Sequence, residues 1–394
     1  MMNNFIENNK YIKISFGGDI MCSKEQSLAV YNKYGKYNYH EYFEGLKPLF
    51  NDSDYVLANL ETPITDNQEY SSSSINFNTP SSILEYIKEC GIHFLSTANN
   101  HCLDRGVKGL EETITNLNKY GLEHSGTYET ENDSETLFIK EINGVKLAIV
   151  CCTYGTNSEH NGVFLPSEEQ WRVNLLKKQK KLQKLKFDPS DSNKTVTTYI
   201  ADDTSPAAIK NIKNQQCLEK IKRQIVDAKN KSDIVIVMPH VGGQYNPVPG
   251  YYTRYIIEEL SSVGADFIIA GHPHVPLKFS NINNTFVVYS LGNLASTPSG
   301  DFFFPNVFSE YGIVLHVYID INTKQINKCT FQLTKCIIDD CGITKVKPIY
   351  DLYTNESVLT QKERLSIDNE ALVNRLISAK EAFVPEFEYS IYEL

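Results

Sequence analysis

TANNHCLDRG, residues 97–106, joins an apolar run to an amphipathic one. It places Asn99, Asn100, His101 and Asp104 at that junction. A solvated turn is the simplest interpretation of such a polar segment. In α/β proteins, however, ligands bind at the carboxyl ends of the strands. If other apolar runs end in similar polar residues, a ligand-binding site at these strand ends is favoured over a solvated turn.

Short apolar runs that end in polar or glycine-rich residues recur along the chain, and each predicts a buried strand. They occupy residues 11–18, 54–61, 92–100, 145–155, 233–243, 266–274 and 285–293. Amphipathic stretches that each close on the glycine expected after a helix lie at 81–91, 107–121 and 252–264. Asn143-Gly144 suits a type I′ turn and predicts a hairpin there. The alternation of strands and helices predicts a layered α/β domain.

Composition excludes several classes of partner. The 394 residues carry a formal net charge of −10 without a basic cluster typical of nucleic-acid binding. No uncharged run of about 18 apolar residues predicts a membrane span, and no apolar secretion signal follows the N-terminus. The nine scattered cysteines favour free thiols in a reducing compartment. We expect a cytoplasmic protein, whose oligomeric state stays open.

Residues 156–230 depart from this rhythm and predict an insertion over the main sheet. A basic surface helix is expected over 168–187, a turn-rich segment over 188–207 and a second helix over 214–232. The lysines of the first helix could recruit an anionic substrate, but a solvated helix face is the favoured interpretation.

We expect two units along the chain, a main domain over 11–300 and a C-terminal extension over 301–394 that packs on the same domain. The extension should begin with a hairpin of alternating strands over 311–338, followed by a helix over 367–379. Its residues offer no candidate catalytic group.

The residues that follow the apolar runs share one chemical character, since they are carboxylates, imidazoles and amides. They are Asp19, Asn59, Glu61, Asn99, Asn100, His101, Asp104, His240, His272, His274 and Asn293. Borderline divalent metals accept this mix of donors, and a carboxylate can bridge two ions about 3.5–4 Å apart. A single such histidine would more often be structural. The concentration of four in this company, with a His-x-His pair on one face of an extended segment, predicts a dinuclear hydrolytic centre.

Six of these segments, in order, resemble the signatures of the CapA family of poly-γ-glutamate capsule biosynthesis proteins. The segments are GGDIM at 17–21, ANLETPIT at 58–65, TANNHCLDRGVKGLEETI at 97–114, TYGTN at 153–157, GADFIIAGHPHV at 264–275 and VVYSLGNL at 287–294. This resemblance implies a calcineurin-like metallophosphoesterase fold. That fold is a four-layer α/β/β/α sandwich with a dinuclear metal centre at one edge.

The resemblance also implies roles for individual residues. Asp19 and His274 would bind the first metal, Glu61 would bridge, and the second metal would be held by Asn100, His240 and His272. His101 would donate a proton to the leaving group, and Asp104 would orient it. We expect the substrate to contact the residues Asn59, Tyr154, Gln244, Tyr245 and Asn293.

The first motif departs from the wider superfamily. It reads Asp19-Ile20-Met21 where Asp-x-His is usual, so the first metal would have one imidazole ligand fewer. We therefore expect a cofactor of one or two divalent ions, which would be manganese, iron or zinc. The segment His240-Val241-Gly242-Gly243-Gln244-Tyr245 likewise replaces the family's His-Trp-Gly-x-Glu-Tyr, which changes the wall and the charge of the pocket.

Two functions stay open from the sequence. The first is a metal-dependent hydrolase that acts on an anionic substrate through a γ-glutamyl or poly-γ-glutamate-type amide or a phosphoester. The alternative is a non-catalytic accessory protein of poly-γ-glutamate synthesis or export that binds the polymer or a synthase partner. The Asn100-His101-x-x-Asp104 set favours the enzyme, because a structural metal site does not require a proton donor. A nucleotide-binding module is disfavoured, since SFGGDIM at 15–21 lacks a dinucleotide fingerprint and a P-loop lysine.

Overall fold

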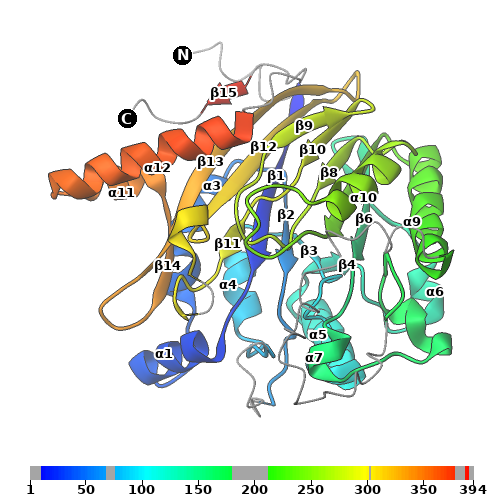
Figure 1. Ribbon diagram of the computed structural model, residues 1–394, viewed down its shortest axis with the longest axis horizontal. Coiled ribbons are helices and arrows are strands. Elements are labelled where there is room, and N and C mark those ends of the chain that lie inside the picture. The colour runs from blue at the N-terminus through cyan, green and yellow to red at the C-terminus, as the bar shows by residue number, and fades with distance from the viewer. Residues whose placement is uncertain (1–9, 68–75, 180–211, 301–302, 378–386, 390–394) are drawn as a thin grey trace, which may run out of the picture.

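The computed structural model describes residues 10–67, 76–179, 212–300, 303–377 and 387–389, and its strands form two sheets (Figure 1). The larger sheet has the order β14-β13-β12-β1-β2-β3-β4, with β11 beside β1 and β15 beside β13. Its strands are β1 (Tyr11–Ile20), β2 (Tyr55–Leu60), β3 (Phe94–Ser96), β4 (Glu123–Ser125), β11 (Asn293–Ala295), β12 (Tyr311–Asp320), β13 (Ile326–Ile338), β14 (Thr344–Pro348) and β15 (Phe387–Tyr389).

The smaller sheet has the order β5-β6-β7-β8-β10-β9. Its strands are β5 (Phe138–Ile142), β6 (Val145–Thr153), β7 (Ile234–His240), β8 (Phe267–Ile269), β9 (Phe279–Ile282) and β10 (Thr285–Val288). Each apolar run of the sequence overlaps one of the strands of the two sheets. The hairpin expected at Asn143-Gly144 joins β5 to β6, and both residues have positive φ. The predicted α/β fold class is confirmed.

Helices cover both outer faces. The larger sheet is covered by α1 (Lys24–Tyr34), α2 (His40–Phe43), α3 (Lys47–Phe50), α4 (Ile83–Glu89) and α5 (Gly106–Tyr120). The smaller sheet is covered by α9 (Ile212–Lys231) and α10 (Tyr251–Ser261). Short helices α6 (Glu131–Ser134) and α7 (Ser158–Asn161) lie in loops, and α11 (Ile349–Asn355) and α12 (Leu359–Ile377) follow β14. These layers make the predicted α/β/β/α sandwich.

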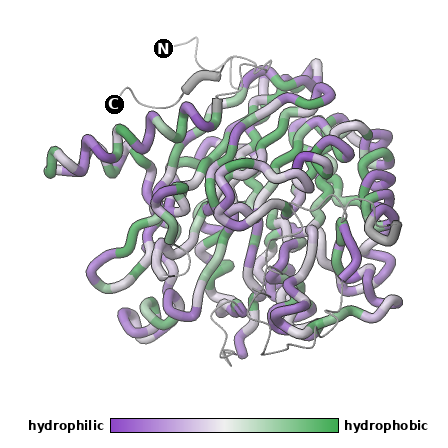
Figure 2. The backbone as a smooth tube through the Cα atoms, in the orientation of Figure 1, coloured by the Kyte–Doolittle hydropathy of each residue, from purple (hydrophilic) through white to green (hydrophobic). Residues whose placement is uncertain are grey.

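Alternation along the strands explains why the sheets stack. In β7, Ile236 joins the core between the two sheets, whereas its neighbour Val237 packs under α9 and α10. In β2, Leu57 likewise faces the inner core and Val56 the helices of the larger sheet. Apolar residues run along the central strands in Figure 2, while the peripheral helices carry mixed apolar and polar faces. Burial on both faces of these strands therefore stabilises all four layers.

The chain after residue 310 continues the larger sheet. β12 pairs antiparallel with β1, with Tyr11 opposite Asp320, and β13 pairs antiparallel with β12. The hairpin expected over 311–338 is confirmed, and α12 covers the expected helix as far as Ile377. The division into units 11–300 and 301–394 stays a prediction.

The insertion differs from its predicted structure. The part of the expected basic helix 168–187 that the structure describes, residues 168–179, holds a short 3-10 helix, η3 (Ser167–Arg172), after which Val173 pairs with Thr127 and Leu175 with Thr153. Residues 180–187 lie outside the described residues. Val173 and Leu175 gain backbone partners at Thr127 and Thr153, and both side chains are buried. These interactions outweigh the local helix propensity. The helix over 214–232 is confirmed as α9, and the segment 188–207 lies outside the described residues.

Among the helices that the structure describes, none combines the length and apolar character needed to cross a bilayer. The cysteines are free thiols, and Cys151 and Cys152 are buried within β6.

Candidate metal centre

Strand register brings the polar ends of the two sheets together. In the larger sheet, Asp19 at the end of β1 pairs with both Asn59 of β2 and Asn293 of β11. In the smaller sheet, His240 ends β7 and pairs with Gly271, directly before His272. Because the strands that end here within each sheet are parallel, their carboxyl ends lie at one edge, where α/β sheets bind ligands.

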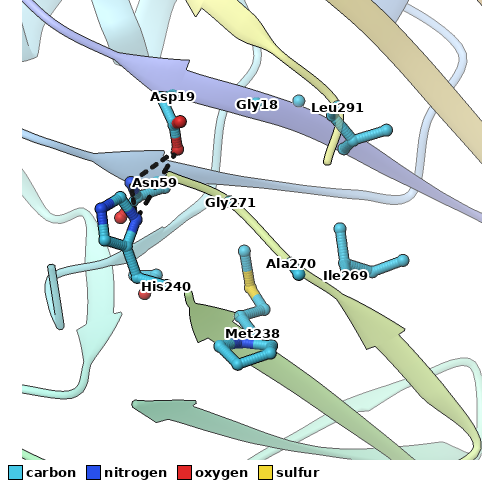
Figure 3. A pocket seen from close by; sticks show the side chains of 12 residues that line it. Gly18, Asp19, Asn59, Met238, His240, Ile269, Ala270, Gly271 and Leu291 are labelled. Carbon is cyan, nitrogen blue, oxygen red and sulfur yellow. Dashed lines mark hydrogen bonds and ion pairs between the residues drawn. The ribbon is translucent and has the colours of Figure 1, made fainter. Parts of the chain in front are cut away.

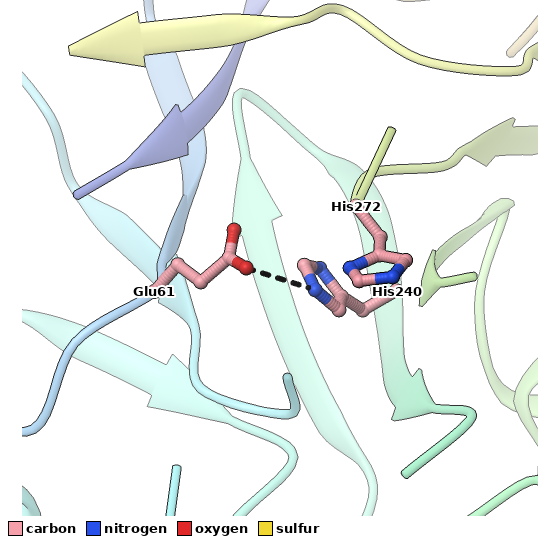
Figure 4. Close-up of side chains that lie close together, drawn as sticks. All are labelled: Glu61, His240 and His272. Atoms are coloured by element: carbon pink, nitrogen blue, oxygen red, sulfur yellow. Dashed lines mark ion pairs between the residues drawn. The ribbon is translucent and has the colours of Figure 1, made fainter. Parts of the chain in front are cut away.

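Five of the six residues expected to bind metal form two ligand sets that share one carboxylate. One set is Glu61, His240 and His272 (Figure 4), and the other is Asp19, Glu61 and His274. In each set, one ligand atom from every residue lies within 4.8 Å of the others. The five side chains are at most 2 % exposed, so water contributes little to their solvation.

Asn100, the sixth expected ligand, lies beside the first set. Its Oδ1 atom is 2.7 Å from Nε2 of His240, and its side chain is fully buried. Within the described residues its Nδ2 atom has no hydrogen-bond partner. Asn100 is therefore placed to join Glu61, His240 and His272, although its role as a ligand stays a prediction.

Several buried polar atoms of the cluster make no hydrogen bond within the described residues, which fits a site for a divalent cation. Oε1 of Glu61, Nδ1 of His272 and Nε2 of His274 are buried and make no hydrogen bond with any described residue. Oε1 of Glu61 lies 3.2 Å from Nε2 of His240 and 3.6 Å from Nε2 of His274. Leaving such atoms unsatisfied is costly, and a cation held by carboxylate and imidazole donors would satisfy them.

Electrostatics within the cluster fit the same interpretation. Burial would raise the pKa of Asp19, but the hydrogen bond to His274 and the nearby imidazoles hold it below its ordinary value. Burial lowers the pKa of His274, yet Glu61 and Asp19 raise it to about 9. A protonated His274 thus compensates the two buried carboxylates, and a metal would have to displace that proton to bind there.

His272 has the opposite character. Burial, followed by the charges on His240, His274, His101 and Lys177, lowers the pKa of His272 well below its ordinary value. Its imidazole is therefore neutral at physiological pH, which is the form that binds metals.

Asn59 and Asn99 form hydrogen bonds that support the side chains of the cluster. Nδ2 of Asn59 donates to Oδ1 of Asp19 at 2.8 Å and lies 3.3 Å from Nδ1 of His240. Asn99, which sequence reasoning did not assign a role, donates to Oδ1 of Asn59 and to the Leu60 carbonyl. These bonds orient the side chains that surround the candidate ions.

The expected proton donor and its orienting acid are paired. Nδ1 of His101 is 2.6 Å from Oδ2 of Asp104, and both side chains are buried. Burial lowers the pKa of His101, but the charge and hydrogen bond of Asp104 outweigh it and raise the pKa. Phe77 was missed from the sequence: its backbone N–H donates to Oδ2 of Asp104, and its ring packs edge-on against His101. Nothing in the local sequence signals this contact across 24 residues.

A pocket behind the cluster lies between the two sheets (Figure 3). Asp19, Asn59 and His240 form its polar side, while Met238 and Leu291 belong to its apolar side. Met238 and Leu291 also belong to the hydrophobic core between the sheets, so the pocket extends from the ligand cluster to that core.

The residues expected to contact substrate lie at different distances from the cluster. The Tyr154 ring packs on His272 with 4.7 Å between centroids, and the Tyr245 ring lies 5.7 Å from His274. Oδ1 of Asn293 is 3.1 Å from Nδ1 of His274. Gln244 is exposed and makes no hydrogen bond to the cluster among the described residues. Their contact with a substrate stays a prediction.

The loop after β8 is strained around its two histidines. His272 has φ 96° and His274 φ 56°, values that L-residues adopt at a cost of about 1–3 kcal/mol each. The backbone N–H of His272 donates to Oδ2 of Asp19 and helps to hold this shape.

Gly271 lets that loop approach Asp19 closely, so a larger residue at this position should disturb the cluster. A Cβ atom at Gly271 would lie 2.7 Å from Oδ1 of Asp19. Gly271→Ala is therefore expected to displace this carboxylate and weaken metal binding at least about tenfold, comparable to losing an orienting contact. Elemental analysis after dialysis at set metal concentrations measures the change. Gly155→Ala, where a Cβ meets open space, is the control, and equal metal content in both variants would contradict the assignment.

The family model for the bacterial capsule synthesis protein PGA_cap matches residues 13–298. The PGA biosynthesis protein CapA of Bacillus subtilis (strain 168) is 27 % identical over 285 residues, covering 72 % of this chain and 62 % of its own length. The capsule biosynthesis protein CapA of Bacillus anthracis is 25 % identical over 290 residues, covering 72 % and 60 %.

The chain thus spans about 60 % of the length of these curated relatives. Among solved structures, a phosphatase from Mycoplasma pneumoniae is similar over 86 % of this chain and 94 % of its own, with 16 % identity and a TM-score of 0.41. The family model covers the segments that supply Asp19, Glu61, His240, His272 and His274. The chain belongs to the PGA_cap family of bacterial capsule synthesis proteins.

Proposed function

We propose that this protein is a metal-dependent hydrolase that acts on an anionic substrate, either at a γ-glutamyl amide of the poly-γ-glutamate type or at a phosphoester. The observation that carries the proposal is the pair of buried ligand sets that share Glu61 and contain unpartnered donor atoms. Two ions that share a carboxylate are typical of hydrolytic centres.

The residues that would hold the ions divide between the two sets. Asp19, Glu61 and His274 would hold one ion, and Asn100, His240 and His272 would hold a second together with Glu61. Manganese, iron or zinc suits this nitrogen and oxygen set, and one or two ions can be accommodated. When bound, such an ion supplies Lewis-acid activation of water and stabilises negative charge that develops on the scissile group.

His101 and Asp104 supply the proton transfer. Oδ2 of Asp104 binds Nδ1 of His101, which leaves Nε2 of the ring to donate a proton to the leaving group. The raised pKa of His101 keeps this proton available near neutral pH. The backbone N–H of Phe77 and Nδ2 of Asn161 donate to the two oxygens of Asp104 and hold it in place.

The polyglutamate part of the proposal rests on the relatives. Two CapA proteins are named for PGA or capsule biosynthesis, and each is similar to this chain over 72 % of its length. A polymer of this class carries a carboxylate on every residue, which agrees with an anionic substrate. Phosphoesters remain in the proposal because the same ion chemistry serves both bonds.

Metal-loaded protein incubated separately with poly-γ-glutamate, short γ-glutamyl peptides and an aryl phosphate tests the proposal. We expect product from one substrate class and none from the others, with loss of product after chelation. Chromatography follows the glutamyl products, and absorbance follows the released phenol. Binding of the polymer without product from any substrate would contradict the hydrolase and identify a non-catalytic accessory protein.

A further inference from the structure

Asn293 is buried beside His274, one of the candidate metal ligands. It begins β11, where it pairs with Asp19 of β1, and it is 2 % exposed. Its Oδ1 atom lies 3.1 Å from Nδ1 of His274. Its Nδ2 atom lies 3.4 Å from the carbonyl oxygen of His274 and 3.2 Å from that of Ser309. Both polar atoms of this amide are therefore engaged by protein groups.

The two carbonyls determine which end of the Asn293 amide faces the imidazole of His274. A carbonyl oxygen only accepts hydrogen bonds, so the atom beside the carbonyls of His274 and Ser309 has to be the donor Nδ2. The opposite orientation would place Oδ1 against two other buried acceptors and leave all three oxygens without a donor, which is costly. The Oδ1 atom of Asn293 is therefore presented to Nδ1 of His274 as an acceptor.

This acceptor favours one tautomer of His274. A neutral imidazole, which is the form that binds metals, carries a hydrogen on only one of its two nitrogens. Nδ1 of His274 faces two oxygen acceptors, Oδ1 of Asn293 and Oδ2 of Asp19 at 3.3 Å. A hydrogen on Nδ1 can donate to these oxygens, which leaves the lone pair on Nε2.

The Nε2 atom of His274 is turned toward the shared carboxylate of the cluster. It lies 3.6 Å from Oε1 of Glu61, and it makes no hydrogen bond within the described part of the chain. Asp19 is itself a candidate ligand, so an ion would compete with Nδ1 for its oxygens. The Oδ1 atom of Asn293 would remain as an acceptor for Nδ1, and such an acceptor fixes the orientation of a histidine that binds metal through its other nitrogen.

Neighbouring strands hold Asn293 in place. The carbonyl of Gly292 accepts a hydrogen bond from the Asp19 N–H at 3.0 Å, and Gly292 also pairs with Gly312 of β12. The carbonyl of Ser309, which accepts from Asn293, lies directly before β12, and Ser309 is buried. The chain that leads into β12 thus helps to orient a side chain at the metal cluster.

We propose that Asn293 is a positioning residue that accepts the Nδ1 hydrogen of His274 and thereby presents Nε2 to the ion of the Asp19, Glu61 and His274 set. This inference rests on the metal centre of the proposed hydrolase, because it assigns a supporting residue of that same centre. The role differs from the substrate contact expected for Asn293 from the sequence, since its polar atoms are engaged within the protein.

Titration of the metal-free protein with zinc, in competition with a chromophoric chelator, tests the assignment. Asn293→Leu keeps a similar shape but removes the acceptor, so it should weaken the binding of at least one zinc ion by about 10–100-fold. Asn293→Asp keeps an oxygen beside Nδ1 and should retain most of the wild-type affinity. Asn293→Ala, which leaves room for water at the two carbonyls, carries the same prediction as Asn293→Leu should the leucine variant not fold.

Asn116→Leu is the matched control, because Asn116 of α5 is also buried and donates to a backbone carbonyl, that of Ile64. The assignment would be overturned by wild-type zinc affinity in Asn293→Leu and Asn293→Ala, by an equal loss in Asn116→Leu, or by an Asn293→Asp variant as weak as Asn293→Leu. Absence of zinc binding to wild type would remove both this role and the hydrolase. Zinc binding that depends on Asn293, without turnover of any substrate, would contradict the hydrolase but leave the positioning role standing.

Discussion

Glu61→Gln is expected to abolish metal retention, because Glu61 belongs to both ligand sets. The substitution preserves the volume of a fully buried side chain but removes its charge and replaces one oxygen by an amide nitrogen. Loss of an orienting contact alone costs about 10–100-fold in metal affinity, so loss of a shared ligand should exceed that range. Elemental analysis of the purified variant measures the loss.

The same substitution should also remove the effect of added metal on the unfolding temperature. A ligand that binds only the native state raises the temperature of unfolding, so added metal should stabilise wild type and leave Glu61→Gln unchanged. Glu310→Gln is the matched control, since Glu310 is also buried but lies at the start of β12, beside Lys335. Full metal content in Glu61→Gln, or equal loss in Glu310→Gln, would show that the cluster does not hold the ion.

His101→Asn is expected to lower turnover by about 10²–10⁴-fold while metal content stays at the wild-type level, because general acid catalysis contributes that range. The prediction concerns whichever substrate is cleaved by wild type. His124→Asn controls for the removal of a histidine, because His124 lies on β4 of the same sheet beside Asn118. Unchanged turnover in His101→Asn refutes the role of this residue as proton donor.

Asp104→Asn gives the same prediction a pH signature. His101 must be protonated to donate, so the activity that depends on this proton is lost as the pH rises through the pKa of His101. Asp104 raises that pKa, and its removal should shift the loss of activity to lower pH. A residue with a purely structural role would lower activity equally at all pH values.

Local sequence was sufficient for most strands, and the family resemblance implied the His101–Asp104 pair. Strands that are buried on one or both faces need apolar runs of strand length, so their positions follow from the pattern of apolar residues along the chain. His101 and Asp104 are three residues apart in one turn, and their contact needs no distant partner. The order of the strands could not be predicted in this way, because β12 and β11 both pair with β1 although about 300 residues separate them from it in the chain.

The insertion shows where local propensity misleads. Residues 168–187 have the composition of a basic helix, yet Val173 and Leu175 pair with the ends of distant segments. The backbone groups of Thr127 and Thr153 that accept this pairing cannot be identified from the sequence of the insertion itself. The position of Lys177 beside Tyr154 follows from this pairing, and periodicity could not have predicted it.

The sequence by itself determined which chemical groups are available and that they follow buried strands, because strand burial and donor type are properties of short segments. The resemblance implied that Glu61 is shared and that His272 and His274 serve different metals, but only the tertiary structure decided that the ligand atoms of each set lie within 4.8 Å of one another. The physical reason is that these distances depend on the register of parallel strands from two sheets and on a strained loop after β8, which Gly271 allows to approach Asp19.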